Sequence, residues 1–408
     1  MNKRKIINDP IYGLVSFPFD HLYELIDHPY FQRLRRVSQM GLSSYVYPGA
    51  NHSRFSHAMG ALHLMTTAIT VLRDKGIKVS DEEYLGVCQA ILLHDIGHGP
   101  FSHGLEEVIY PRHHEAISLD IMHALDKEYG GQLALGIDIF EGKYHRPFLH
   151  ELVSSQLDMD RMDYLTRDSF YTGVAEGVIG YKRLISMMNV VDDHIVIEEK
   201  AIFSIEKFLV ARHFMYWQVY LHKTSIVAER MLREVVLRII ELIKEDQLGD
   251  ATNLGLIQFL KGRLSGTIND TNYLDTFTHL DDIDVVVCLK TFINHPDPIL
   301  SHLSHRLLDR QLNKLILRNS PISSDLLAEI RHKVVNTFEN SPSHSRLTTK
   351  MIDKLIYQGE ESNQAYNNYK ENIRVLRKDG TVVPISDVLE TLINVKKITK
   401  YYLCYPIN

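Results

Sequence analysis

The stretch at residues 91–103 constrains this chain more than any other. An apolar helical run ends there in His94-Asp95, and two further histidines, His98 and His103, follow among glycines and a proline. Imidazole and carboxylate groups both ligate divalent cations, and glycines let the backbone turn tightly beneath them. The stretch therefore predicts part of a metal site, although a polar helix end with a charge-assisted hydrogen bond could have the same sequence.

Composition places the chain among soluble globular proteins. Its 408 residues are 45% hydrophobic and 24% charged, enough for a large core divided into two or three lobes. The net charge of −6 argues against a surface that coats nucleic acid. Three widely spaced cysteines read as buried thiols in a reducing compartment. With neither a signal-peptide core nor an apolar run of membrane-spanning length, we expect a cytoplasmic enzyme with no membrane partner.

The order of local signals predicts a mainly α-helical chain. We expect an irregular or short-strand lead-in over residues 1–20, a helical core over 21–225, a helical extension over 226–335 and a smaller mixed α/β lobe over 336–408. Ser80 and Glu83 form a capping box that starts the helix ending at His94. Further helices are predicted over 151–167 and from a Ser204 cap to Lys223.

Two β-hairpins are also predicted. The first covers residues 190–199, with Asp192-Asp193 at its turn. The second and clearer one covers residues 373–385, with Asp379-Gly380 at its turn, and belongs to the C-terminal lobe.

Four side chains from three segments of the chain form the expected metal-ligand set. They are His57, His94, Asp95 and Asp160. Two imidazoles and two carboxylates can hold one divalent iron, manganese or zinc ion while leaving positions open for water and a phosphate oxygen. Such an ion would activate water and neutralise charge on a phosphoryl group, which is what phosphoester hydrolysis requires.

The order and spacing of these groups resemble the HD superfamily of metal-dependent phosphohydrolases. Within it, the chain most resembles the deoxynucleoside triphosphate triphosphohydrolases related to the human SAM-and-HD-domain protein. The resembling segments lie between residues 5 and 225 and include 5–13, 26–35, 45–57, 94–103, 158–168 and 212–223. The resemblance implies an HD-domain helical core and hydrolysis of dNTPs to deoxynucleosides and inorganic triphosphate.

The resemblance also assigns roles to single residues. It makes His57, His94, Asp95 and Asp160 the metal ligands, with Mg²⁺ accompanying the nucleotide phosphates. His98, His103 and His114 would surround the α-phosphate, with Glu115 behind His114 and either His103 or His114 protonating the 5′ oxygen. Arg54, Arg161 and Arg212 would clamp the triphosphate, although the family often has lysine at the position of Arg161. The sugar pocket would comprise Gln39, Tyr164, Asp168 and Tyr220.

A second group of residues resembles the family's activator-nucleotide site. It consists of Lys5, Asp27, Gln32 and Arg35, with Val46, Tyr47, His222 and Lys223. The resemblance places this site between subunits and implies a homotetramer stabilised by GTP or a dNTP, with a dimer as the smaller alternative. The same dispersed polar residues could equally form an ordinary surface.

Other interpretations stand beside these. We expect Asp158 and Asp163 to support the ligands rather than bind metal, His52 to lie at a surface or core edge, and Arg33 and Arg36 to lie on a solvated helix face.

Two functions compete with dNTP hydrolysis: an HD phosphohydrolase acting on a monophosphate, an alarmone or a cyclic nucleotide, and a non-catalytic sensor of nucleotides or single-stranded nucleic acid. Three arginines favour a triphosphate, and the acidic total charge disfavours nucleic acid.

Overall fold

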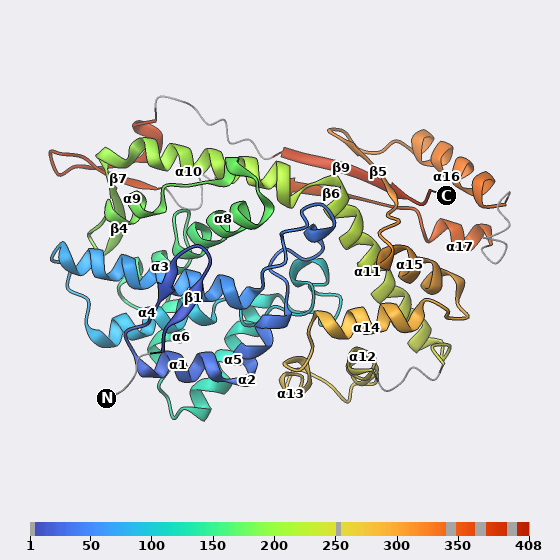
Figure 1. Cartoon of the computed structure of the whole chain (residues 1–408), viewed down its shortest axis with the longest axis horizontal. Coiled ribbons are helices and arrows are strands. Elements are labelled where there is room, and N and C mark those ends of the chain that lie inside the picture. The colour runs from blue at the N-terminus through green and yellow to red at the C-terminus, as the bar shows by residue number, and fades with distance from the viewer. Residues whose placement is uncertain (1–4, 250–253, 340–347, 364–372, 390–397, 408) are drawn as a thin grey trace.

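The computed structural model describes residues 5–249, 254–339, 348–363, 373–389 and 398–407. Parts of the expected lead-in (1–4), helical extension (250–253) and C-terminal lobe (340–347, 364–372, 390–397 and 408) lie outside the described residues. The predicted fold class is confirmed: the chain is mainly helical, with small sheets, one of them C-terminal (Figure 1).

The first half of the chain builds a helical body that follows a short hairpin of β1 (Ile7–Asp9) and β2 (Gly13–Val15). Its helices are α1 (Asp20–Asp27), α2 (Pro29–Gln32), α3 (Arg54–Asp74), α4 (Asp81–Leu93), α5 (His114–Glu128), α6 (Ala134–Phe140), α7 (Pro147–Val153), α8 (Met159–Thr172) and α9 (Tyr181–Ser186). Short 3₁₀ turns lie at Arg33–Arg36 (η1), Ser43–Tyr45 (η2), Ser102–Gly104 (η3) and Ala175–Gly177 (η4).

The second half begins along this body and then leads into a second lobe (Figure 1). Helix α10 (Ile202–Met215) continues through a π-helical turn, η6 (Tyr216–Tyr220), into α11 (Lys223–Lys244). The remaining helices are α12 (Gly255–Ser265), α13 (Leu274–Phe277), α14 (Asp282–Phe292), α15 (Pro298–Leu308), α16 (Ser324–Glu339) and α17 (Thr349–Asp353). Single 3₁₀ turns lie at Glu199–Ala201 (η5) and Ile385–Asp387 (η9).

Two sheets divide the C-terminal residues between the lobes. The order β3–β4–β7–β8 joins a hairpin of the first body to the later hairpin, because β7 pairs in parallel with β4. The order β5–β9–β6 builds the far lobe. The strands are β3 (Met188–Val191), β4 (His194–Glu198), β5 (Lys314–Arg318), β6 (Tyr357–Asn363), β7 (Arg374–Leu376), β8 (Val382–Pro384) and β9 (Ile398–Tyr405). Strand β5 lies within the region expected to be helical, because it finds its partner almost ninety residues later along the chain.

Both predicted hairpins are present. Asp192 and Asp193 adopt positive φ angles of 50° and 56°, the conformation that a tight two-residue turn between antiparallel strands requires. The turn of the second hairpin has Gly380 at φ +87°. The capping box of Ser80 and Glu83 at the start of α4 is also confirmed.

Two predicted helix boundaries are wrong. The helix expected over 151–167 is broken, because the Asp158 carboxylate accepts from the backbone N–H groups of Ser155 and Arg161 and starts a new helix, α8. Ser204 caps nothing: α10 begins at Ile202, directly after the 3₁₀ turn η5, so Ser204 lies inside the helix.

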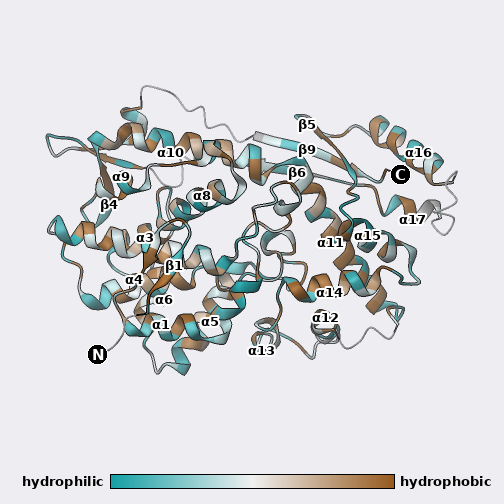
Figure 2. Cartoon of the chain, in the orientation of Figure 1, coloured by the Kyte–Doolittle hydropathy of each residue, from teal (hydrophilic) through white to brown (hydrophobic). Residues whose placement is uncertain are grey.

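The long helix α3 lies at the centre of the first body. It is apolar on nearly every face, and Figure 2 shows hydrophobic residues along it and along neighbouring α4. Among the described residues it is the one helix long and apolar enough to cross a membrane, but 72% of the relevant stretch is buried inside the protein. A buried core helix explains this composition. The three cysteines are buried and free, as predicted.

The expectation that Arg33 lies on a solvated helix face is wrong. Arg33 is 1% exposed, and its guanidinium donates to the carbonyl oxygens of Ile96 at 2.8 Å and Leu280 at 3.0 Å. It thereby ties the turn that follows His94-Asp95 to the second half of the chain. Arg36, by contrast, keeps 47% of its side chain exposed and pairs with Asp281 at 2.5 Å.

We expect Arg33→Met to lower the free energy of unfolding by about 2–4 kcal/mol, because two buried carbonyl groups lose a charged donor. Urea unfolding followed by circular dichroism would measure this. Arg36→Met is the comparison on the same turn, and loss of its ion pair, in which the arginine is about half exposed, should cost less, about 1 kcal/mol. Equal losses for both variants would contradict a bridging role for Arg33.

Candidate metal centre and cavity

Two helices bring the first two candidate ligands together. His57 lies in the first turn of α3, which Ser53 caps, and His94 lies at the end of α4. Their Nε2 atoms are 3.4 Å apart. His57 is fully buried and His94 is 8% exposed, so both rings belong to the interior of the protein.

The other nitrogen of each ring determines its tautomer. Nδ1 of His57 lies 2.8 Å from a carboxylate oxygen of Asp163, and Nδ1 of His94 lies 2.7 Å from the carbonyl oxygen of Ile91. Since both partners only accept, both rings donate from Nδ1. The two Nε2 lone pairs of the neutral rings then face each other, which is unfavourable unless a cation or a proton lies between them.

Two carboxylates complete the cluster. Asp160 Oδ1 lies 3.0 Å from His57 Nε2 and 3.5 Å from His94 Nε2. Asp95 Oδ1 lies 3.5 Å from His94 Nε2, and its Oδ2 lies 3.7 Å from His57 Nε2 while also pairing with Arg54. The structure thus brings all four predicted ligands together, with His57, His94 and Asp160 the tightest group. This donor set fits one divalent transition-metal ion.

Electrostatics within the cluster favour a positive charge at its centre. Burial opposes ionisation of Asp160, but hydrogen bonds from His57 and His94 hold the pKa of this carboxyl well below its usual range. Burial likewise disfavours a charged His57, yet Asp160 and Asp163 raise the pKa of that imidazole to about 10. A metal ion would replace the proton that these groups otherwise hold, and its binding would release protons.

A buried charge chain supports His57 from behind. Asp163 accepts from His57 and also pairs with Arg167 at 2.9 Å, and Arg167 reaches Asp9 at 2.9 Å. A Cβ at Gly60 would lie 2.0 Å from Asp163 Oδ1, so only glycine on α3 lets α8 come this close. The expectation that Asp163 supports the ligands therefore agrees with the contacts it makes, and Asp158 acts as the α8 cap.

Three further histidines form a second ring cluster beside the first. His98 stacks on His114 with ring centroids 3.8 Å apart, and His103 meets both rings edge-on. A Cβ at Gly97 would lie 2.2 Å from the carbonyl oxygen of His114, so this glycine lets α5 approach the turn after α4. Burial and nearby Arg54 hold the pKa of His98 well below its usual value, which keeps that ring neutral.

Glu106, which the sequence did not single out, joins this cluster. Its carboxylate accepts from Nδ1 of His103 at 2.8 Å and from Nδ1 of His114 at 2.5 Å. Burial opposes its charge, but these two hydrogen bonds hold its pKa well below the usual range. Glu115, expected behind His114, instead has a mostly exposed side chain 3.8 Å from His113. The three-residue spacing from His103 to Glu106 was the sequence signal that could have indicated this pair.

One cavity of about 450 Å³ connects both clusters with the expected substrate residues. Its volume suits a small-molecule ligand. Its walls include the substrate-site candidates Gln39, Arg54, Arg161, Tyr164, Asp168 and Tyr220, together with the candidate ligands Asp95 and Asp160 and the candidate catalytic residues His98, His103, His114 and Glu115.

The sugar-pocket candidates form a hydrogen-bonded network on one wall. Tyr220 donates to Asp168 Oδ2 at 2.7 Å, and the other oxygen of Asp168 lies 2.7 Å from His52 Nε2. The expectation of a surface or core-edge role misses this contact: His52 is 4% exposed and stacks on Tyr171. The Gln39 side-chain oxygen is buried and has no partner among the described residues.

The three arginines differ in their present contacts. Arg54 donates to Ser102 and pairs with Asp95, and Arg161 donates to the carbonyl oxygen of Ser155 at 2.6 Å. Arg212 donates to Gln156 at 3.0 Å, and its buried Nε has no partner among the described residues. Arg54 and Arg161 line the cavity and Arg212 does not; the charge of Arg212 opposes the rise that burial causes in the pKa of Tyr164.

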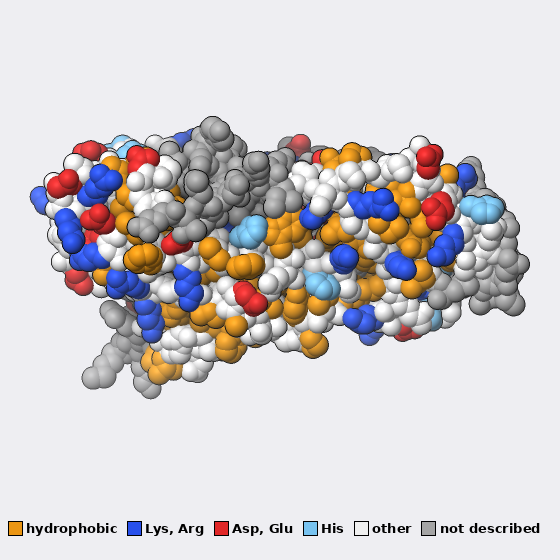
Figure 3. Space-filling model, turned by 90° about the horizontal axis from the view of Figure 1, so that it is seen from above, with side chains coloured by type: hydrophobic (Ala, Val, Ile, Leu, Met, Phe, Trp, Pro, Cys, Tyr) orange, Lys and Arg blue, Asp and Glu red, His pale blue; other side chains and the backbone are white. Residues whose placement is uncertain are grey.

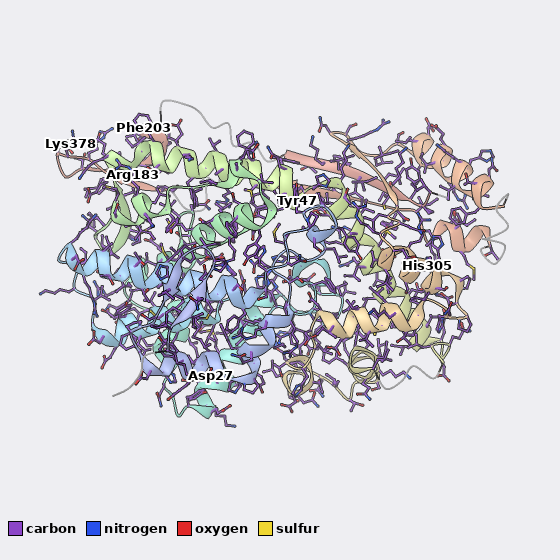
Figure 4. The ribbon with its side chains drawn as sticks, viewed as in Figure 1. Asp27, Tyr47, Arg183, Phe203, His305 and Lys378 are labelled. Carbon is purple, nitrogen blue, oxygen red and sulfur yellow. The ribbon has the colours of Figure 1, made fainter. Side chains whose placement is uncertain are left out.

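The activator-site candidates separate into two groups. Lys5 pairs with Asp27, and Gln32 accepts from Arg35 at 2.8 Å, so these four residues gather near α1 and η1. The other four are Val46, Tyr47, His222 and Lys223. The ring centroids of Tyr47 and His222 are 6.0 Å apart. Figure 4 shows Asp27 and Tyr47 on well-separated parts of the subunit. One subunit therefore does not join the two groups.

The comparisons with known proteins agree with this architecture. The family described as the HD associated region matches residues 179–272. A crystal structure of a phosphohydrolase from Bacteroides thetaiotaomicron is 44% identical, with a TM-score of 0.91, and the match covers 99% of this chain and 100% of that one.

Two curated relatives extend the comparison. An uncharacterised protein of Bacillus subtilis, YwfO, is 31% identical over 76% of this chain and 72% of its own length. The deoxynucleoside triphosphate triphosphohydrolase SAMHD1 homolog of Dictyostelium discoideum is 34% identical over 60% of this chain and 52% of its own, so the match spans only about half of that protein. With the buried His/Asp centre, these similarities show that the chain belongs to the HD-domain phosphohydrolases related to the SAMHD1 proteins.

Proposed function

We propose that this protein hydrolyses dNTPs to deoxynucleosides and inorganic triphosphate. The observation that carries the proposal is the single cavity that joins the His/Asp centre to Arg54 and Arg161 on one side and to the Tyr220–Asp168 pair on another. The two arginines can balance the negative charge of a triphosphate, and the carboxylate of Asp168 can accept a hydrogen bond from a sugar hydroxyl. The Dictyostelium relative, which is named a deoxynucleoside triphosphate triphosphohydrolase, supports the same substrate class.

We propose that His57, His94, Asp95 and Asp160 hold one Fe, Mn or Zn ion. Such an ion supplies Lewis-acid chemistry by neutralising phosphoryl charge and lowering the pKa of a water molecule. Asp163 and the Ile91 carbonyl orient the two imidazoles, so that their Nε2 atoms point at the centre before substrate binds. Mg²⁺ would accompany the nucleotide phosphates.

We propose that His103 or His114 donates a proton to the departing 5′ oxygen. Each ring bonds to Glu106 through Nδ1, which leaves Nε2 available to the substrate. Because the low pKa of Glu106 keeps this carboxylate charged, it stabilises a positive charge on either imidazole. Neutral His98 would then act as a hydrogen-bond partner of the α-phosphate.

We expect purified, metal-loaded protein to release triphosphate and deoxynucleoside from at least one dNTP. His94→Ala should lose both the bound metal, measured by plasma mass spectrometry, and turnover, because one of two imidazole ligands is gone. His123→Ala is the control, since this histidine is exposed on α5 and does not line the cavity. Release of phosphate or diphosphate instead, or turnover only of monophosphates, alarmones or cyclic nucleotides, would contradict the proposal. Oligonucleotide binding without any turnover would favour the sensor.

We expect Glu106→Gln to lower kcat by about 100-fold with little change in metal content, because the proton-donating imidazole loses its charged partner. Steady-state kinetics on the best dNTP would measure this. Glu115→Gln provides the comparison, because Glu115 lies near His113 rather than behind His114. A larger loss of kcat for Glu115→Gln than for Glu106→Gln would contradict the supporting role of Glu106.

We also propose that GTP or a dNTP binds at a second site and stabilises a homotetramer. The two groups of activator candidates lie apart in one subunit, which agrees with a site completed by a neighbouring subunit. Exposed apolar side chains on α10, including Phe203 at 78% and Phe214 at 41% exposure, suit subunit packing. Figure 3 looks onto this side of the molecule and shows hydrophobic and basic side chains mixed there.

We expect GTP to increase dNTP turnover and to shift the protein to a larger species in light scattering. Asp27→Ala should weaken both effects, because the carboxylate that would accept from a guanine edge is lost, while turnover without activator remains. Asp20→Asn on the same helix is the control. If GTP changed neither size nor rate, the second site would be refuted while the catalytic proposal stood.

A further inference from the structure

The side chain of Glu229, on α11, lies in the wall of the cavity. It fits against two glycines from other segments. A Cβ at Gly41 would lie 2.9 Å from Glu229 Oε1, and a Cβ at Gly104 would lie 3.5 Å from its Cγ. Because any larger residue at Gly41 would displace the carboxyl group, the backbone leaves room for Glu229 at this place.

This carboxyl group has no hydrogen-bond or ion-pair partner among the residues that the structure describes. Its neighbour Arg230 is engaged with Glu361 and with the ring of Tyr402. Burial raises the pKa of Glu229 to about 7, although the charge of neighbouring Arg230 opposes this shift. The side chain is partly buried and borders the cavity. A carboxyl group in this position can accept a hydrogen bond from a donor that arrives with the ligand.

The other carboxylates of the cavity are already occupied. Asp95 pairs with Arg54, Asp160 with the two ligand histidines and Asp168 with Tyr220. Asp158 accepts from two backbone N–H groups, and Glu115 lies near His113. Glu229 thus differs from Asp95, Asp158, Asp160 and Asp168 in having its acceptor oxygens available, and from Glu115 in being partly buried.

The surroundings of Glu229 differ from the phosphate and sugar walls. Met40 and Phe101, which are 7% and 6% exposed, line the same cavity and offer apolar surface for a flat ring. We propose that Glu229 reads the base of the dNTP by accepting a hydrogen bond from an amino group on the base edge. This inference rests on the proposed function and adds a specificity-determining residue to it.

The bases differ in the groups that they would present to Glu229. Adenine, cytosine and guanine present an exocyclic amino group, whereas thymine and uracil present only a ring N–H between two carbonyl groups. A carboxylate attracts the amino donor and repels the carbonyl oxygens. The enzyme should therefore prefer amino-bearing bases, and the preference should depend on the acceptor at residue 229.

The test compares pairs of substrates that differ at this group. We expect wild-type kcat/KM for dATP to exceed that for 2′-deoxynebularine 5′-triphosphate, which has hydrogen in place of the 6-amino group, by about 10- to 100-fold. The preference for dCTP over dUTP should be similar. Glu229→Ala should bring both ratios close to one, and Glu229→Gln, which keeps a carbonyl acceptor, should restore part of them.

Glu234→Gln is the matched control, because Glu234 lies on the same helix, has a pKa raised by burial and does not line the cavity. It should leave both ratios at their wild-type values. Wild-type turnover of the paired substrates within twofold would overturn the inference without touching the proposed function. Unchanged ratios in a folded Glu229→Ala variant would overturn it too. Absence of any dNTP turnover would refute the proposed function itself.

Discussion

The structure depends on two buried imidazoles whose Nε2 atoms face each other across 3.4 Å. Such an arrangement persists only if each ring is held from behind, and Asp163 and the Ile91 carbonyl do this for His57 and His94. The close approach of the two nitrogens favours a cation, because a positive charge is stabilised most at the point between them. Asp160 and Asp95 then add negative charge at the same point.

Holding this centre requires unusually close packing of helices. Gly60 lets α8 approach α3 until the Asp163–Arg167 pair presses against the α3 backbone, and Gly97 does the same for α5 and the turn after α4. Arg33 links that turn to the second half of the chain through backbone carbonyls. These buried charges are tolerated because Asp163 pairs with Arg167 and Arg33 donates to two carbonyl groups.

Local rules predicted the elements that local interactions determine. The Ser80–Glu83 capping box, the Asp192-Asp193 and Asp379-Gly380 turns and the helix ending at His94 depend on residues within a few positions of one another, so a sequence reading locates them. Strand β5 could not be found this way, since its partner β9 is distant in sequence. The break before α8 was missed because an acidic run reads equally as a helix surface or as an N-cap.

The sequence by itself indicated the class of chemistry, because the His and Asp residues and their spacing predict a cation site with arginines nearby. Only the tertiary structure decided which neighbour supports which residue. Glu106 rather than Glu115 bonds to His114, His52 is buried against Asp168, and Arg33 is interior rather than solvated. These partners come from different helices and turns, and burial and hydrogen-bond geometry depend on packing that no local pattern encodes.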